Sequence, residues 1–96
     1  MIGTISEYTV SSTNTTDELV DLIKAQEISQ SPNLVPENFV LKKCGILSTS
    51  DGEVYVNGKL FTLIKNQALE FGYGLMDVKS IKSNTSGIKL IIRYLY

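Results

Sequence analysis

Four carboxylates in the second half of the chain are the side chains best suited to acid–base chemistry: Asp51, Glu53, Glu70 and Asp77. A pair of such groups is what glycoside hydrolysis requires. The stretch from Asp51 to Glu53 also offers oxygen atoms for calcium, but it lacks the ligand density of a calcium loop. All four acids fall at expected turns or strand ends, where solvated carboxylates are common. We therefore predict no catalytic pair and no metal site.

An activated nucleophile would have little support in this sequence. The chain contains no histidine and a single cysteine, Cys44, which excludes a Cys/His or Ser/His/Asp arrangement within one copy. The missing histidine also argues against a zinc site of the usual type. Cys44 has no disulfide partner in the chain and lies in the apolar run from Phe39 to Leu47, which predicts a buried thiol. We predict a non-enzymatic protein without a cofactor.

The tripeptide Gly72-Tyr73-Gly74 presents an aromatic residue between two glycines. The ring of Tyr73 could stack on a sugar or contact a partner protein. The alternative is a turn that needs both glycines for its φ angles, with Tyr73 folded back on the protein. The tripeptide is too weak a signal for a phosphate-binding loop, since no helical pattern follows it.

Four basic residues gather near the C-terminus: Lys79, Lys82, Lys89 and Arg93. If their strands form a hairpin, Lys79 lies near Lys89 or Arg93. Nucleic-acid-binding proteins interleave such cations with aromatic residues and carry a net positive charge, whereas this chain has a net charge of −1. The pattern favours a solvated face, or a face that docks an acidic segment of a neighbour, and no nucleic acid.

Charge is divided unevenly along the chain. Residues 1–38 hold six acidic residues and one basic residue, a net charge of −5. Residues 39–96 hold four acidic and eight basic residues, a net charge of +4. The two parts attract each other, either within one chain or between neighbouring chains. The simpler explanation is that helices collect acidic residues while strands tolerate lysine.

The strongest structural signal is Asn57-Gly58 between two apolar runs, because a type I′ turn needs positive φ at both central residues. A two-residue loop fixes the cross-strand partners, which share a face of the hairpin. The predicted core face carries Val54, Val56, Phe61 and Leu63, with Lys59 at its rim. The opposite face is half apolar, so we expect another part of the chain or another molecule to cover its apolar residues: Tyr55, Leu60 and Ile64.

Further strands are expected at 39–48, 69–71 and 78–83, separated by turn residues. Gly45 marks a bulge or a close backbone approach. The run 88–96 is long and β-branched and reads as a central strand, because an exposed edge of this kind would invite aggregation. Residues 39–96 therefore predict a compact antiparallel β-sandwich or barrel, mainly β in class.

The N-terminal segment, residues 1–38, is expected to form an arm that precedes the β domain. Residues 4–10 alternate as in a short edge strand or an extended arm, and a polar, flexible linker follows. A helix is predicted at about 16–28, with Thr15 and Glu18 as a capping box. Two prolines in the stretch 29–38 end the helix and mark the boundary.

Neither a membrane span nor a secretory signal is expected. No apolar run approaches the roughly 18–20 residues that cross a bilayer. The first residues have no basic region and no long apolar region of the secretory type. We therefore expect no membrane partner.

Two stretches give the chain a resemblance to small virion proteins of tailed bacteriophages, of the head-decoration, head-fibre and tail-accessory types. These are Glu53-Val-Tyr-Val-Asn-Gly-Lys-Leu-Phe-Thr-Leu and the closing segment 78–96, preceded by an arm with a short helix. The resemblance implies a structural role in a virion, assembled in the bacterial cytoplasm and repeated on the particle. It also implies binding to other virion proteins, homo-oligomers with a trimer favoured, and no cofactor.

Three functions are therefore considered for this chain. The first is a self-associating structural protein of a phage particle. The second is a carbohydrate-binding β module in which Tyr73 and Tyr55 stack on sugar rings, and the third is a small inhibitor directed at a host enzyme. The candidate interaction surface consists of Tyr55, Leu60, Ile64, Tyr73, Lys79, Lys89 and Arg93.

Overall fold

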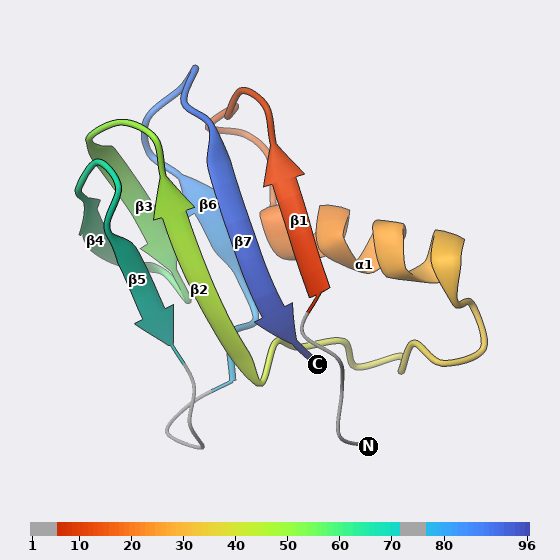
Figure 1. Cartoon of the computed structure of the whole chain (residues 1–96). Helices are drawn as coiled ribbons and strands as arrows, with labels where there is room; N and C mark the ends of the chain where they lie inside the picture. The colour runs from red at the N-terminus through yellow and green to blue at the C-terminus, as the bar shows by residue number, and fades with distance from the viewer. Residues whose placement is uncertain (1–5, 72–76) are drawn as a thin grey trace.

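The computed structural model describes residues 6–71 and 77–96, so Tyr73 and its flanking glycines lie outside the described residues. Within these ranges the chain forms one helix and seven strands, arranged in two antiparallel sheets (Figure 1). The elements are β1 (Ser6–Val10), α1 (Leu19–Gln30), β2 (Lys43–Ser48), β3 (Gly52–Val56), β4 (Lys59–Leu63), β5 (Ala68–Phe71), β6 (Ile81–Ser83) and β7 (Leu90–Leu95).

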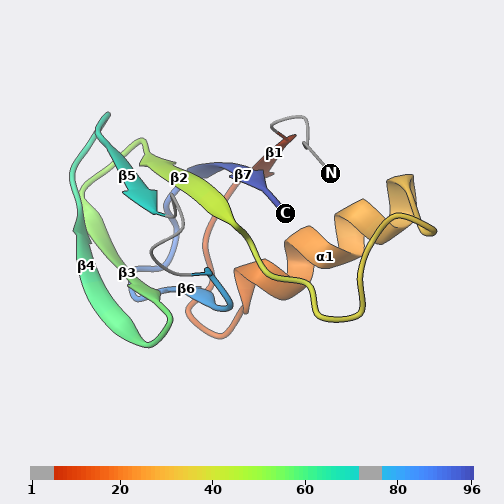
Figure 2. The same cartoon turned by 90° about the horizontal axis from the view of Figure 1, so that it is seen from below.

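The two sheets pack as a sandwich, one of the two predicted architectures, and do not close into a barrel. One sheet has the strand order β1-β7-β2-β5 and the other β4-β3-β6. Seen from below, α1 continues the layer of the three-stranded sheet beyond β6 (Figure 2). The strands β4, β3 and β6 and helix α1 thus cover the inner face of the four-stranded sheet. The buried apolar side chains between the two layers form one core.

The predicted hairpin at Asn57-Gly58 is confirmed, and all of its predicted cross-strand residue pairs are present. Both residues have positive φ, 52° and 80°, and Tyr55 pairs with Leu60 as the two-residue loop requires. The predicted core face is inward: Val54, Val56 and Leu63 are fully buried, and Phe61 is partly buried. Lys59 sits at the rim with its ammonium 5.7 Å from the Phe61 ring centroid.

Helix α1 begins at Leu19, so the predicted start at residue 16 and the capping box were wrong. Asn14 holds the preceding residues in a turn, because its Oδ1 accepts hydrogen bonds from the amide and hydroxyl of Thr16. Glu18 is itself the N-cap and accepts from the amide of Val20 at 3.2 Å. The helix then runs two residues further than the predicted end at residue 28.

The described part of the N-terminal segment docks on its own chain. Strand β1, one of the two forms expected for residues 4–10, pairs with β7 at the edge of the four-stranded sheet. Leu19, Val20 and Ile23 of α1 belong to the same buried core as the strands. In the linker predicted to be flexible, Thr13 is buried and its hydroxyl donates to Thr85 O and accepts from the Ile88 amide.

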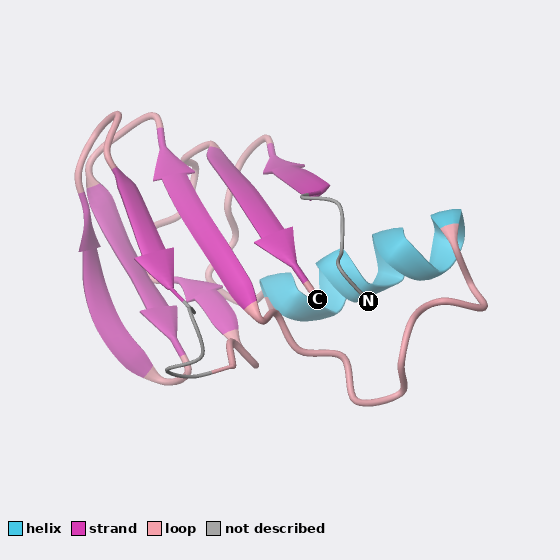
Figure 3. Ribbon diagram, turned by 60° about the horizontal axis from the view of Figure 1, so that its bottom comes forward, coloured by secondary structure: helices cyan, strands magenta, loops and turns pink. Residues whose placement is uncertain are grey.

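Strand β7 is central, as predicted, and lies between β1 and β2. The expected hairpin between β6 and β7 is wrong, since β6 pairs with β3 in the other sheet. The segment that joins them is hydrogen bonded to β3 and to the segment between β1 and α1: Glu53 N donates to the Thr85 hydroxyl, and Thr13 N donates to Ile88 O. The chain therefore passes from one sheet to the other between β6 and β7; Figure 3 shows the two sheets with the helix beside them.

Candidate functional site

The outer face of the β3–β4 hairpin carries an apolar patch, here named the hairpin patch: Tyr55, Leu60 and Ile64. Their exposed fractions are 37%, 44% and 50%. Tyr55 and Leu60 are cross-strand partners, and Ile64 lies beyond them on the same face, because side chains alternate along a strand. Of the two covers that were expected, the rest of the chain leaves these side chains partly exposed, and a second molecule stays a prediction.

Polar side chains border the hairpin patch. Lys82 of β6 pairs with Tyr55 on the side opposite Leu60. Glu53 accepts a hydrogen bond from the side-chain amide of Asn84 at 3.1 Å. An apolar centre with a polar rim is the usual anatomy of a protein–protein interface.

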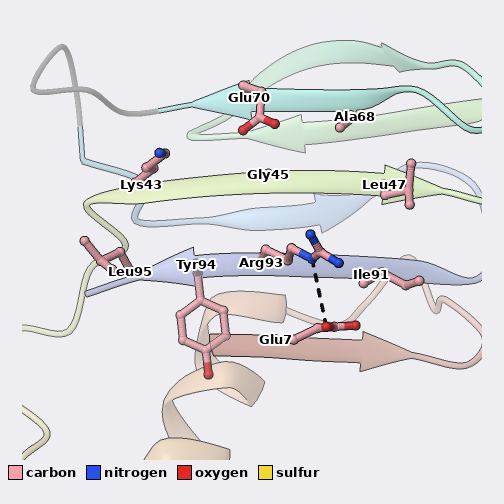
Figure 4. Close-up of a pocket in the computed structure, with 10 residues that line it drawn as sticks. All are labelled: Glu7, Lys43, Gly45, Leu47, Ala68, Glu70, Ile91, Arg93, Tyr94 and Leu95. Atoms are coloured by element: carbon pink, nitrogen blue, oxygen red, sulfur yellow. Dashed lines mark ion pairs between the residues drawn. The ribbon is translucent and has the colours of Figure 1, made fainter. Parts of the chain in front are cut away.

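The outer face of the four-stranded sheet carries a hollow of about 390 Å³, here named the Gly45 hollow (Figure 4). Gly45 lies in the row of paired residues between Arg93 on β7 and Glu70 on β5. Because Gly45 has no side chain, the middle of this row is recessed, and the carboxylate of Glu70 extends over it. The residues that line the hollow are Glu7, Lys43, Gly45, Leu47, Ala68, Glu70, Ile91, Arg93, Tyr94 and Leu95.

Charges of both signs face the Gly45 hollow. Glu7 of β1 pairs with Arg93, and their side chains form a loose ion pair at 3.9 Å. The Glu7 side chain is 51% exposed and the Arg93 side chain is 72% exposed. Glu70 leans toward Gly45, since a Cβ built there would lie 3.0 Å from its Oε2. The next row is apolar, with Leu47 between Ile91 and Ala68.

The four basic residues do not form one cluster through the hairpin that was expected, because β6 and β7 belong to different sheets. Lys79 lies beside Asn57, whose Oδ1 accepts from the Lys79 amide at 2.8 Å. Lys89 is exposed just before β7, and Arg93 lines the Gly45 hollow. The candidate residues therefore divide between at least two surfaces.

Cys44 is buried and faces the core, as predicted. Burial, with the charge of Glu70 acting in the same direction, raises the pKa of its thiol from 9.0 to about 12. A thiol with so high a pKa stays protonated near neutral pH and is a poor nucleophile. Its part in the structure is packing.

A polar cluster lies under β7 and was not foreseen. The hydroxyl of Tyr94 donates to Glu27 Oε1, and the hydroxyl of Tyr96 donates to Glu27 Oε2 at 3.4 Å. Burial and the neighbouring Glu27 raise the pKa of both phenols. Because Glu27 and Tyr94 are buried and hydrogen bonded to each other, the cluster fixes α1 on the sheet.

The Gly45 hollow could not be found from the sequence. Gly45 was expected at a bulge or a close approach, and the structure shows continuous pairing on both sides with Glu70 close above it. The useful signal is a glycine flanked in space by Arg93 and Glu70. That signal appears only when the order of the strands is known.

No family model, no curated protein and no solved structure matches this chain. Among residues 6–71 and 77–96, no group of three or more side chains is placed to hold a metal ion. The described helix is too short to cross a membrane.

Proposed function

We propose that this protein is a non-enzymatic structural protein of a bacteriophage particle, which binds other virion proteins and associates with copies of itself. The observation that carries the proposal is the hairpin patch. Single exposed apolar residues are normal on a protein surface, but Tyr55 and Leu60 are adjacent partners in a sheet and Ile64 extends the same face.

The hairpin patch is also well organised for binding. The turn at Asn57-Gly58 fixes the register of the two strands, and the side chain of Asn57 donates to Asp77 O and accepts from the amides of Lys79 and Ser80. A surface that is already ordered loses little conformational entropy when a partner binds. Rigid presentation of apolar groups suits a protein that works by contact.

The resemblance to small virion proteins supplies the class of partner. It rests on the hairpin sequence, on the closing segment 78–96 and on the short helix of the N-terminal segment. The expected partner of the hairpin patch is another protein of the particle, and the expected location is the virion. Segment 1–38 was expected to pack on a neighbouring chain or on the particle, but β1 and α1 dock on their own chain. We therefore assign these contacts to the outer faces of the sandwich.

Mass spectrometry of purified phage particles tests this function. We expect the chain in many copies per particle, together with known head or tail proteins. Particles that assemble in cells making the chain but contain none of it would contradict the proposal.

A binding assay assigns the contact to the hairpin patch. Purified chain is mixed with particles that lack it and is then sedimented with them. The double variant Tyr55→Ser/Leu60→Ser should fail to sediment, whereas Leu34→Ser, which changes a 66% exposed leucine elsewhere, should bind normally. Equal binding by both variants would remove the patch from the proposal, and binding of glycans that is lost in Tyr55→Ala would favour the carbohydrate alternative.

A further inference from the structure

We propose that the Gly45 hollow is the surface through which two copies of this chain associate, related by a two-fold axis parallel to β2. This inference rests on the self-association included in the proposed function and names its surface. It uses a different part of the molecule from the hairpin patch. The hollow faces away from the core on the four-stranded sheet (Figure 4).

Charged residues flank Gly45 in a fixed order across the four-stranded sheet. Pairing between the strands places Glu7, Arg93, Gly45 and Glu70 in one row. A half-turn about an axis that runs parallel to β2, above Gly45 and midway between the two copies, exchanges the two sides of this row. Arg93 of one copy then lies opposite Glu70 of the second copy, and the same contact occurs twice.

The neighbouring row fits the same operation. Leu47 lies on β2 beside the axis and therefore meets Leu47 of the second copy, while Ile91 meets Ala68. A large side chain opposite a small one is favourable for interdigitation. The interface would therefore have an apolar row beside two ion pairs.

Gly45 gives these ion pairs their space. Two sheets pack about 10 Å apart when ordinary side chains fill the gap. The missing side chains of Gly45 in both copies leave room for the long side chains of Arg93 and Glu70. Arginine suits this place, because its planar guanidinium binds a carboxylate through two hydrogen bonds.

The overall charge of the face also favours a second copy. Glu7 and Glu70 balance Lys43 and Arg93, so the face has no net charge. A strongly acidic or basic partner would gain no general attraction here. Lys43 lies on β2 and would approach Lys43 of the second copy at one end of the interface, whereas the row of Arg93, Gly45 and Glu70 is complementary to itself under the half-turn. This row points to a copy of the same chain.

Charge reversal tests this arrangement in the whole chain by sedimentation equilibrium. Arg93→Glu places acids opposite acids, and Glu70→Arg places bases opposite bases. Each variant alone should dimerise at least about 100-fold more weakly than the unmodified chain, since each interface then holds two like-charge contacts. An equimolar mixture of the two variants should dimerise again, because both contacts are then between opposite charges.

Two further variants serve as controls. Lys82→Glu, on the outer face of the other sheet, should leave dimerisation unchanged. Gly45→Val fills the hollow and should weaken it by at least about tenfold through a steric clash. The Cβ at this position meets only the flexible end of Glu70, so the variant should fold, as circular dichroism would show.

The possible results distinguish a wrong choice of interface from an absence of self-association. If Arg93→Glu, Glu70→Arg and Gly45→Val all dimerise as strongly as the unmodified chain, the Gly45 hollow is not the interface, although the chain still self-associates. A mixture that stays as weak as the single variants overturns the Arg93–Glu70 contact. A trimer in place of the dimer contradicts the two-fold axis, and an unmodified chain that stays monomeric contradicts self-association itself.

Discussion

Helix α1 and the β3–β4 hairpin lie in the same layer of the sandwich (Figure 2), and they differ in how their exposed apolar side chains are arranged. The helix buries Leu19, Val20 and Ile23 and leaves Leu22 and Ile28, six positions apart, 38% and 43% exposed. The hairpin buries one face and leaves Tyr55 and Leu60 of the other face in solvent. The exposed apolar residues of the hairpin are thus adjacent cross-strand partners, whereas those of the helix are separated, and the proposed function assigns a partner to the adjacent pair.

The strand edges that face α1 are hydrogen bonded to side chains of the helix and of its N-cap. Beside the helix, Ile81 N on β6 donates to Glu18 Oε2 at 2.8 Å, and Glu7 O on β1 accepts from the amide of Gln26 at 3.4 Å. Helix side chains thus occupy backbone groups at both edges, which blocks further strand pairing there. On the opposite side, Phe61 and Phe71 pack edge to face with centroids 5.0 Å apart and join the two sheets.

The largest expected effect concerns the buried face of the helix. Ile23→Ala should lower the free energy of unfolding by about 2–5 kcal/mol, because Ile23 is fully buried and its loss leaves a cavity. Ile28→Ala on the same helix, where 43% of the side chain is exposed, should change it by less than about 1 kcal/mol. Urea denaturation measures both. Equal losses would mean that α1 does not dock as described.

Glu18→Gln should cost about 1–3 kcal/mol, because the carboxylate accepts hydrogen bonds from Val20 N, Ile81 N and the Ser80 hydroxyl. The matched control is Asp21→Asn in the first turn of the same helix, which alters only the interaction with the helix dipole, worth about 0.3–1 kcal/mol. A loss at Glu18 no larger than at Asp21 would contradict its role as a tie between helix and sheet.

Gly58→Val tests the other end of the layer. Gly58 has a φ of +80°, and a β-branched residue in that region costs about 1–3 kcal/mol. An added Cβ meets nothing within 4 Å, so the loss would report backbone strain alone. Thermal or urea unfolding that matches the unmodified protein would show that the turn is not as described.

Alkaline pH should destabilise the protein through groups under the four-stranded sheet. The pKa of Cys44 is raised from 9.0 to about 12 by burial, and the pKa of Tyr94 is raised by burial and by Glu27. Above pH 9 the unfolded chain releases protons that the folded chain retains, so stability is full below pH 9 and falls toward pH 12. Cys44→Ala should flatten the first part of this fall, and an unchanged pH profile would contradict the thiol's contribution.

The smallest expected effect on stability is at the hairpin patch. Leu60→Ser should change the free energy of unfolding by no more than about 0.5–1 kcal/mol, because 44% of the side chain is exposed. The same change should weaken binding to the particle. A loss of stability as large as that of Ile23→Ala would place Leu60 in the core and would erase the contrast between the two ends of the layer.

Sequence reasoning succeeded where the physics is local. The dipeptide Asn57-Gly58 carries its own φ preference, so the turn, the register and both faces of the hairpin followed from twelve residues, 53–64. The central position of β7 followed from its apolar composition. Both features depend on neighbours in the chain rather than on the order of the strands.

Sequence reasoning failed where distant residues decide the outcome. The start of α1 depends on Glu18 bonding to Ile81, 63 positions away. The path between β6 and β7 depends on Thr13, which is hydrogen bonded to Thr85 and Ile88. The Gly45 hollow likewise exists because β5 and β7 lie on either side of β2. None of these partners has a spacing that a pattern could reveal.

The most direct test of this account is sedimentation equilibrium of the unmodified chain over a wide range of concentration at neutral pH. The account predicts a mass that rises with concentration from that of one chain, 10.6 kDa, to that of two. A mass of 10.6 kDa at every concentration would contradict the claim that this chain associates with copies of itself through the Gly45 hollow.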